Sequence, residues 1–465
     1  MDYDVIILGG GIVGCAVAYE LSKYNLNIAL IEKDFDIADD ISFINTSIIY
    51  DGAEAEDDEM SQLEQEGNKL FDDICEKFNI PFKRVPSLII AEDEEDLKFI
   101  EEIKNRAERR GIKDIHIIDE RSIRDIEPEV PGKIKRALYN KNIAIVSPYD
   151  LAISYGEVAY DNGVNFKMEE SVIDVQRRSK GLRVITNKNK FSCRMVVNTI
   201  STEGYTINNG KYPHKDNLIK RLTYISIDSK GKDNQSNIIF TPNNNNNFYY
   251  NLSSLTGERI FAIVDDKPYG FHSVLKSAST FLKDLNKNDV NSFYHTEVSL
   301  KGIFIDDEKI DKGYINVAGA SYGKITITPA LAIRIAGSVA SILGSSKNKN
   351  FVDKRRDFYR FRSMKNKERN DIIALDKKYG KIVCMCNEVT EGEIVDSIRR
   401  PLGARTLEGV KRRTGAGMGS CHGAYCTNKI ISIIAREMGK SPMEIVDDSK
   451  NSYLLSSRIK EFDDI

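Results

Sequence analysis

The chain has 465 residues, enough for two or three domains with hydrophobic cores of ordinary size. Its 67 basic and 70 acidic residues nearly balance, so the net charge of −3 gives no indication of nucleic acid or an anionic membrane as the main partner. No apolar run is long and uncharged enough to span a membrane, and Asp2 and Asp4 stand where a signal peptide would carry basic residues. We therefore expect a soluble, cytoplasmic protein, while peripheral docking to a membrane stays open.

The first predicted elements form a strand–turn–helix unit. Residues 4–8 are an apolar run typical of a buried parallel strand, and the turn Gly9-Gly10-Gly11-Ile12-Val13-Gly14 leads into a helix that ends near residue 24. Residues 27–31 form a second strand, which is closed by Glu32. This is G-x-G-x-x-G between a strand and a helix, with an acidic residue after the second strand, the fingerprint of a dinucleotide site.

Each part of the fingerprint has a physical role. Gly9 permits the tight turn, Gly11 lets a pyrophosphate approach the backbone, and Gly14 permits close packing of helix on strand. The helix N-terminus then faces the phosphates, and Glu32 can bind an adenosine ribose hydroxyl. Because the fingerprint stands at the start of the chain and has no second copy, it favours FAD over NAD.

Three later segments continue the nucleotide-binding pattern: Ile145-Val-Ser-Pro-Tyr-Asp-Leu151, Ala159-Tyr-Asp-Asn-Gly-Val164 and Gly313-Tyr-Ile-Asn-Val-Ala-Gly319. They resemble the D-amino-acid-oxidase-type FAD superfamily, although relatives often have a glycine at the position of Ala144. More narrowly, the chain is similar to the branch with 2-hydroxyglutarate oxidases and the large subunits of anaerobic glycerol-3-phosphate dehydrogenases. The resemblance covers most of residues 1–345 and implies an α/β fold, with a Rossmann-like FAD-binding domain and an interleaved α+β substrate domain.

The resemblance also implies how the chain is divided. The FAD-binding domain would be assembled from about 1–75, 145–205 and 306–345, and the substrate domain from about 76–144 and 206–305. After these we expect a linker over 346–379, a small helical domain over 380–436 and a C-terminal tail over 437–465.

The resemblance implies which residues contact FAD, because they stand at the positions of the family's FAD-binding residues. The segment around Val172 would pass its backbone beside the adenine, and Thr328-Pro-Ala330 would open the helix after the strand at 313–319. The predicted FAD-binding residues are Gly9, Gly11, Ile12, Val13, Gly14, Glu32, Lys33, Thr46, Ser47, Val172, Gly319, Lys324, Ile325 and Thr326.

Three residues are candidates for the chemistry at the flavin. Gly323-Lys-Ile-Thr326 resembles the Gly-Lys-Leu-Thr of glycerol-3-phosphate dehydrogenases, so Lys324 would lie at a helix start and supply a cation to a reduced flavin or a substrate phosphate. An exposed loop lysine is the alternative. Tyr50 takes the place of a histidine that one subgroup has near the flavin. Arg221 is a candidate for binding the substrate's anionic group, with a solvated surface arginine as the alternative.

Two other departures weaken the substrate assignment. Relatives usually have Asn-Ala-Ala-Gly after the strand at 195–198, whereas this chain has Asn198-Thr-Ile-Ser201, so a glycine is missing where the backbone approaches the cofactor. Relatives also tend to have Gly-Val/Leu-Arg-Pro before the last strand, with the arginine facing the substrate's anion. Here Phe304 follows Gly302-Ile303.

Four of the seven cysteines stand as two close pairs, Cys384-Met-Cys386 and Cys421-His-Gly-Ala-Tyr-Cys426. Two thiolate pairs brought together by the fold can bind zinc or an iron–sulfur cluster. Zinc ligands are usually spaced as Cys-x2–4-Cys, so the spacing fits zinc less well than a cluster, and a disulfide also stays open. Buried thiols are predicted at Cys15, Cys75 and Cys193.

The segments around these pairs are Tyr379-Gly-Lys-Ile-Val-Cys384, Val389-Thr-Glu-Gly-Glu-Ile394 and Thr406-Leu-Glu-Gly-Val-Lys-Arg-Arg-Thr414. Over roughly residues 380–436 they resemble the BFD-type [2Fe–2S]-binding domain, with all four family ligands in place. The resemblance implies a [2Fe–2S] cluster held by Cys384, Cys386, Cys421 and Cys426.

A flavin accepts two electrons, whereas an iron–sulfur cluster accepts electrons one at a time. The combination of the two cofactors therefore favours a dehydrogenase that passes electrons to a separate acceptor subunit or protein. We expect it to oxidise a small anionic 2-hydroxy or amino compound, with a compound like glycerol 3-phosphate as the best guess. The departures at Ser201 and Phe304 suggest an alternative, an FAD- and [2Fe–2S]-containing electron-transfer or structural subunit that has lost substrate oxidation.

Overall fold

The computed structural model divides into two compact units. The first unit is made of residues 1–39, 152–196 and 344–465, and the second of 40–151 and 197–343. The structure describes residues 1–38, 47–128, 130, 132–200, 205–208, 219–228, 236–243, 247–255, 258–282, 285–299, 303–307, 309–319 and 321–457.

The sheet of the first unit has parallel strands at its centre. β1 (Tyr3–Leu8) pairs with β2 (Ile28–Ile31), and β2 pairs with β9 (Asn165–Lys167), both in parallel. All four residues of β2 are buried, as expected for parallel strands covered on both faces. The order β10-β11-β12-β1-β2-β9 includes the antiparallel ribbon β10 (Val172–Arg177), β11 (Leu182–Thr186) and β12 (Lys190–Asn198). Besides the helices of its C-terminal part, the unit contains α1 (Ile12–Ser22) and most of α5 (Pro148–Asp161).

The C-terminal part of the first unit is small and mainly helical, as predicted. Thr390 and Thr406 cap two of its helices, because their side chains accept the backbone N–H groups of Glu393 and Gly409. Its hydrophobic core extends past the last helix to Ile445. The elements are α8 (Asn366–Leu375), β20 (Ile382–Cys384), β21 (Val389–Thr390), α9 (Glu391–Arg399), α10 (Leu407–Thr414) and α11 (Thr427–Met438).

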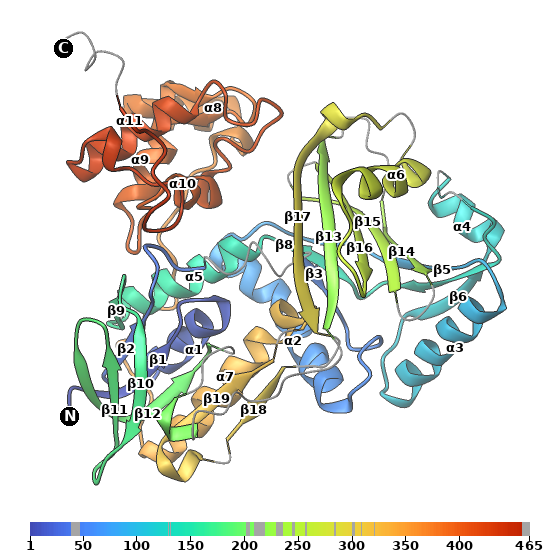
Figure 1. Ribbon diagram of the computed structural model, residues 1–465. Helices are drawn as coiled ribbons and strands as arrows, with labels where there is room; N and C mark the ends of the chain where they lie inside the picture. The colour runs from blue at the N-terminus through green and yellow to red at the C-terminus, as the bar shows by residue number, and fades with distance from the viewer. Residues whose placement is uncertain are drawn as a thin grey trace. The chain divides into compact units, whose positions relative to one another are not determined.

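The second unit contains a mostly antiparallel sheet with a helix on each face (Figure 1). Successive residues of the strand β16 (Glu258–Asp265) face opposite sides of the sheet. Phe261 packs with the hydrophobic residues of α6 (Phe271–Phe281), and Ala262 packs on the other face in a cluster with those of α3 (Glu94–Arg109). A short helix, α4 (Glu120–Ile126), packs at the β6–β7 end. In sheet order the strands are β17 (Val290–Ser299), β13 (Ile219–Asp228), β16 (Glu258–Asp265), β15 (Asn247–Ser253), β14 (Ile238–Asn243), β5 (Ser87–Ala91), β7 (Arg136–Asn140) and β6 (Ile115–Asp119).

Two long helices pack closely in the second unit. α2 (Asp58–Phe78) lies against α7 (Lys324–Leu343) at Gly67, where an added Cβ would lie only 1.9 Å from the carbonyl oxygen of Thr326. A side chain at this position would therefore force the helices apart. The remaining strands are β3 (Ile48–Ile49), β4 (Phe82–Arg84), β8 (Ala144–Val146), and the antiparallel pair β18 (Phe304–Asp306) and β19 (Tyr314–Ala318).

The prediction that Thr328-Pro-Ala330 opens the helix after the strand at 313–319 is wrong. α7 begins at Lys324, so Pro329 lies inside the helix and leaves one carbonyl of the first turn without its backbone donor. By length and composition, α7 could cross a membrane, but 67% of its apolar window is buried inside the protein, as in core helices of folded domains. The predicted burial of Cys15, Cys75 and Cys193 is confirmed.

Candidate functional site

The glycine turn leads into a helix whose first backbone N–H groups have no side-chain cap. Gly9 has a φ of 95°, in the region that favours glycine, and its N–H donates to the carbonyl of Ile31 at 2.9 Å. Gly11 is the extended N-cap of α1 and makes no side-chain cap hydrogen bond. Orphan N–H groups at a helix start attract anions, so the turn fits a pyrophosphate.

Glu32 lies directly beside this turn. One carboxylate oxygen accepts the Gly10 N–H at 2.5 Å, and the other accepts the Asp34 N–H at 3.0 Å. The loop after Glu32 returns to the turn, where the Ala38 N–H donates to the Gly10 carbonyl at 2.9 Å. The predicted ribose-binding carboxylate is therefore fixed at the mouth of the glycine turn by backbone contacts.

The other predicted FAD residues of this unit lie on α1, on β10 and just after β2. Ile12 and Val13 are buried in the first turn of α1, and Val172 is half-buried at the start of β10. The side chain of Lys33 is exposed and approaches Asp34 at 3.9 Å.

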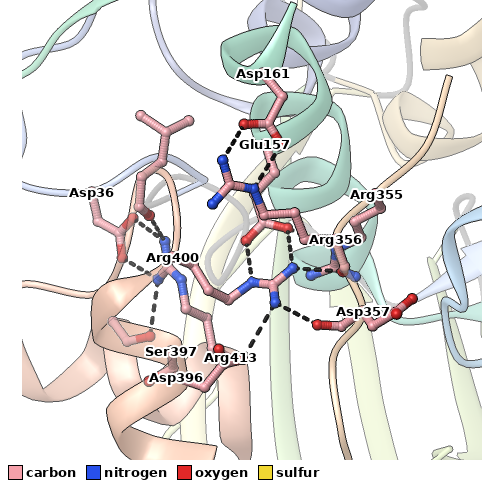
Figure 2. Close-up of polar contacts among 12 residues, drawn as sticks. Asp36, Glu157, Asp161, Arg355, Arg356, Asp357, Asp396, Ser397, Arg400 and Arg413 are labelled. Carbon is pink, nitrogen blue, oxygen red and sulfur yellow. Dashed lines mark hydrogen bonds and ion pairs between the residues drawn. The ribbon is translucent and has the colours of Figure 1, made fainter. Parts of the chain in front are cut away.

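A buried carboxylate joins α5 to the C-terminal part of the first unit. Figure 2 shows Glu157 between two arginines: Arg400 donates to both carboxylate oxygens at 2.7 and 3.0 Å, and Arg355 donates to one of them at 2.8 Å. The three side chains are at most 6% exposed. Burial alone would raise the pKa of Glu157, but the hydrogen bonds and charges of the two arginines hold it below the usual value.

The second unit brings two of the three catalytic candidates to the start of α7. The Tyr50 N–H donates to the Thr326 hydroxyl at 3.0 Å, and the Tyr50 ring meets the Tyr322 ring edge-on, with centroids 4.9 Å apart. Lys324 is the first residue of α7 and is half-buried, so it is not a fully exposed loop lysine. Arg221 lies on β13, and its neighbour Leu222 shares a hydrophobic cluster with Tyr50.

An acidic residue that sequence reasoning missed lies at the same helix start. Glu64 of α2 is fully buried, and neither carboxylate oxygen has a hydrogen-bond partner among the described residues. An added Cβ at Gly323 would lie 2.1 Å from Glu64 Oε1, so the carboxyl group reaches the residue before α7. Burial, and then the charges of Glu54 and Asp51, raise the pKa of Glu64 well above its usual value.

The sequence contained a signal for this group. Glu64 lies on the apolar face of an amphipathic helix, spaced with the buried residues Met60, Leu63, Gly67 and Phe71. An acid within such a stripe predicts a buried carboxyl group.

The remaining predicted residues are distributed as follows. Ser47 and Gly319 have positive φ values of 64° and 98°, and Ile325 and Thr326 are buried in the first turn of α7. Thr46 and Ser201 lie outside the described residues, as does the side chain of Phe304.

The four cysteines of the predicted cluster site lie close together. Cys384 and Cys426 are buried, Cys421 is half-buried and Cys386 is exposed. Burial, and then the charges of the other three thiols, raise the pKa of Cys426 to about 11. Within the described part of the chain, no three Cys, His, Asp or Glu side chains converge on a single metal ion. A two-iron cluster needs no such convergence, because its four thiolate ligands are shared between two irons.

Comparison with known proteins agrees with both parts of this description. Residues 4–337 match the family described as FAD dependent oxidoreductase, and residues 382–436 match the BFD-like [2Fe-2S] binding domain. The glycerol 3-phosphate dehydrogenase of Caloramator mitchellensis is 33% identical over 485 residues, which cover 98% of this chain and 99% of that protein. The mitochondrial L-2-hydroxyglutarate dehydrogenase of Caenorhabditis briggsae is 36% identical over 158 residues, which cover 33% of this chain and 36% of that protein.

A solved structure shares the fold. The dithionite-reduced L-alpha-glycerophosphate oxidase of Mycoplasma pneumoniae, with FAD bound, superimposes with a TM-score of 0.67 at 20% identity, over 77% of this chain and 99% of that one. The predicted resemblance and cofactors are thereby confirmed. The chain belongs to the FAD-dependent oxidoreductase family and carries FAD together with a [2Fe–2S] cluster domain.

Proposed function

We propose that this protein is a dehydrogenase that oxidises a small anionic 2-hydroxy compound, with glycerol 3-phosphate as the first candidate, and passes the electrons to a separate acceptor protein. The observation that carries the proposal is the similarity to the Caloramator mitchellensis glycerol 3-phosphate dehydrogenase across 98% of the chain. The cluster domain supports a dehydrogenase, because an enzyme that reduces oxygen directly needs no one-electron outlet.

The FAD would be held mainly by backbone. We assign the pyrophosphate to the turn at Gly9 and Gly11 and to the uncapped start of α1, the ribose to Glu32, and the adenine to the backbone at Val172. When bound, FAD supplies the two-electron acceptor for the carbon that bears the substrate's hydroxyl group.

In the second unit, Lys324 would supply positive charge near the flavin or the substrate, and Tyr50 would line the same site. The uncompensated carboxyl at Glu64 gives this helix start an unusual polar environment for a core position. Burial of this kind, beside a helix N-terminus, is common where charge develops during catalysis.

We assign the cluster to Cys384, Cys386, Cys421 and Cys426. Anaerobically purified protein should contain iron and acid-labile sulfide, both of which a Cys386→Ser variant should lose while it keeps FAD. One zinc and no iron per chain would overturn the assignment of a [2Fe–2S] cluster.

A second candidate is an electron-transfer subunit without substrate oxidation. It is favoured by Tyr50, which stands in place of a histidine and is only 5% exposed against Tyr322. Anaerobic addition of glycerol 3-phosphate, 2-hydroxyglutarate, proline or sarcosine discriminates the two. Bleaching of the flavin absorbance by one substrate supports the dehydrogenase, and no bleaching by any of them supports the second candidate.

The role of Lys324 has its own test. In Lys324→Ala, flavin reduction by the substrate should slow by roughly 10²-fold, the loss typical of one positioned electrostatic donor, and the flavin potential should fall. Lys312→Ala, an exposed lysine of the same unit, is the matched control. Unchanged potential and unchanged kinetics would remove Lys324 from the site. A selective loss of affinity for phosphorylated substrates would instead assign it to the phosphate.

A further inference from the structure

The C-terminal part of the chain reaches the nucleotide-binding loop through one arginine. Arg413 of α10 donates to both carboxylate oxygens of Asp36, at 2.5 and 2.6 Å (Figure 2). The two side chains are 3% and 4% exposed. Arg413 also donates to the carbonyls of Gly409 and Leu402, at 3.0 and 2.7 Å, so its planar group is held in one orientation.

Asp36 lies in the loop that carries the proposed ribose ligand. The loop starts at Glu32, and it closes where Ala38, with a φ of 65°, donates its N–H to Gly10. Between these points the Ile37 N–H donates to the Asp36 carboxylate at 2.8 Å. Asp36 therefore holds its own loop and Arg413 at the same time.

The packing around the ion pair leaves little room for the loop to shift. An added Cβ at Gly409 of α10 would lie 2.7 Å from Asp36 Oδ2. On the other side of the loop, an added Cβ at Gly156 of α5 would lie 2.5 Å from Ile37 Cδ1 and 3.3 Å from Leu402 Cδ1. The loop is thus enclosed between α5 and the C-terminal part of the unit.

We infer that Arg413 is a positioning residue for FAD: through Asp36 it holds the 32–38 loop in the conformation that binds the adenosine end, so that the C-terminal domain controls how firmly the chain retains FAD. The inference rests on the proposed assignment of Glu32 to the ribose. Coupling between two sites is reciprocal, so bound FAD also stabilises the docked [2Fe–2S] domain.

The test measures FAD release from the purified holoprotein, by the rise in free-flavin fluorescence after dilution. Lysine keeps the charge of Arg413 but cannot make the paired hydrogen bonds. Arg413→Lys should therefore release FAD on the order of tenfold faster, within the range of measured couplings. Asp36→Asn tests the same contact from the other side, and the double variant should be no faster than the faster single variant.

Two neighbouring arginines provide controls. Arg412→Lys perturbs a contact with Asp448, 2.5 Å away within the C-terminal segment, and Arg400→Lys perturbs the contact with Glu157 without touching the loop. Both should release FAD at the wild-type rate. Equal acceleration in Arg400→Lys would overturn the inference, because docking in general, and not the loop contact, would then hold FAD.

The reciprocal effect gives a readout independent of flavin release. The wild-type holoprotein should lose its cluster absorbance to an iron chelator more slowly than wild-type protein stripped of FAD, and this protection by FAD should shrink in Arg413→Lys. If Arg413→Lys does not fold, the same two measurements on Asp36→Asn decide whether the loop contact holds FAD. FAD release and chelator protection at wild-type values would overturn the inference, whereas a wild type purified without FAD would overturn the proposed FAD site instead.

Discussion

Glu64→Gln should make the protein more stable, and increasingly so as the pH rises. Because burial raises the pKa of Glu64 in the folded state, the folded protein keeps a proton that the unfolded chain releases above about pH 4.5. A group that binds more protons when folded lowers the free energy of unfolding as the pH rises. The slope is about 1.4 kcal/mol per pH unit, from the ordinary pKa up to the raised one. Glutamine has the same shape and no charge, so the variant's free energy of unfolding lacks this pH-dependent loss.

The assay is thermal unfolding of wild type and variant from pH 5 to pH 8. For a domain near 250 residues, 1.4 kcal/mol corresponds to roughly 3 °C in Tm, so the two curves should diverge by about that amount per pH unit. Asp51, whose pKa is also raised by burial, is present in both proteins and cancels in the comparison. Glu66→Gln on the same helix, which loses a half-exposed pair with Arg334, should show no divergence. A constant offset between Glu64→Gln and wild type would refute the reasoning.

Three further predictions use the packing and the ligand sets. Glu157→Gln should leave two buried arginines without their carboxylate and lower the free energy of unfolding by about 3–5 kcal/mol. The measurement is the Tm at which the cluster absorbance is lost. The control Asp161→Asn removes a half-exposed pair and should cost at most about 1 kcal/mol. Gly67→Ala should destabilise the protein by about 1–3 kcal/mol or more, since the added Cβ meets the backbone of another helix. Gly337→Ala should stabilise it slightly, because the added Cβ meets no other atom. The Tm measured by fluorescence checks both variants. Cys421→Ser should lose the visible cluster spectrum and retain FAD; an unchanged cluster spectrum would contradict the assignment of Cys421 as a ligand.

Local patterns made the nucleotide turn and the cysteine pairs predictable. Gly9 to Glu32 is a continuous segment whose strand, turn and helix each have a sequence signal, and the structure shows those elements within a residue or two. At the start of α7 two sequence signals disagree: the Gly323-Lys-Ile-Thr326 motif predicts Lys324 at a helix start, as the structure has it, whereas Thr328-Pro-Ala330 predicts a start four residues later. Proline is tolerated near a helix start, so its position marks the boundary only to within a turn.

Long-range contacts could not be predicted in the same way. Arg413 and Asp36 are 377 positions apart, and no periodicity in either segment indicates that they meet. Arg413 belongs to the domain that carries the cysteine pairs, yet its side chain pairs with the nucleotide-binding loop. Only the fold decides which of two adjacent arginines, Arg412 or Arg413, makes that contact.

The buried acid and the main departure from relatives meet at one place, and this bears on the choice between the two candidate functions. A tyrosine at position 50 cannot accept a proton near neutral pH as readily as the histidine of the subgroup. An uncompensated carboxyl such as Glu64 lowers stability, and such groups persist mainly where they serve a function. If Glu64→Gln stabilises the protein and also abolishes flavin reduction by substrate, the acid belongs to the chemistry that replaced the histidine. If it stabilises the protein and flavin reduction is unaffected, the acid has no part in the reaction, and Lys324 alone would carry the electrostatic role proposed for the start of α7.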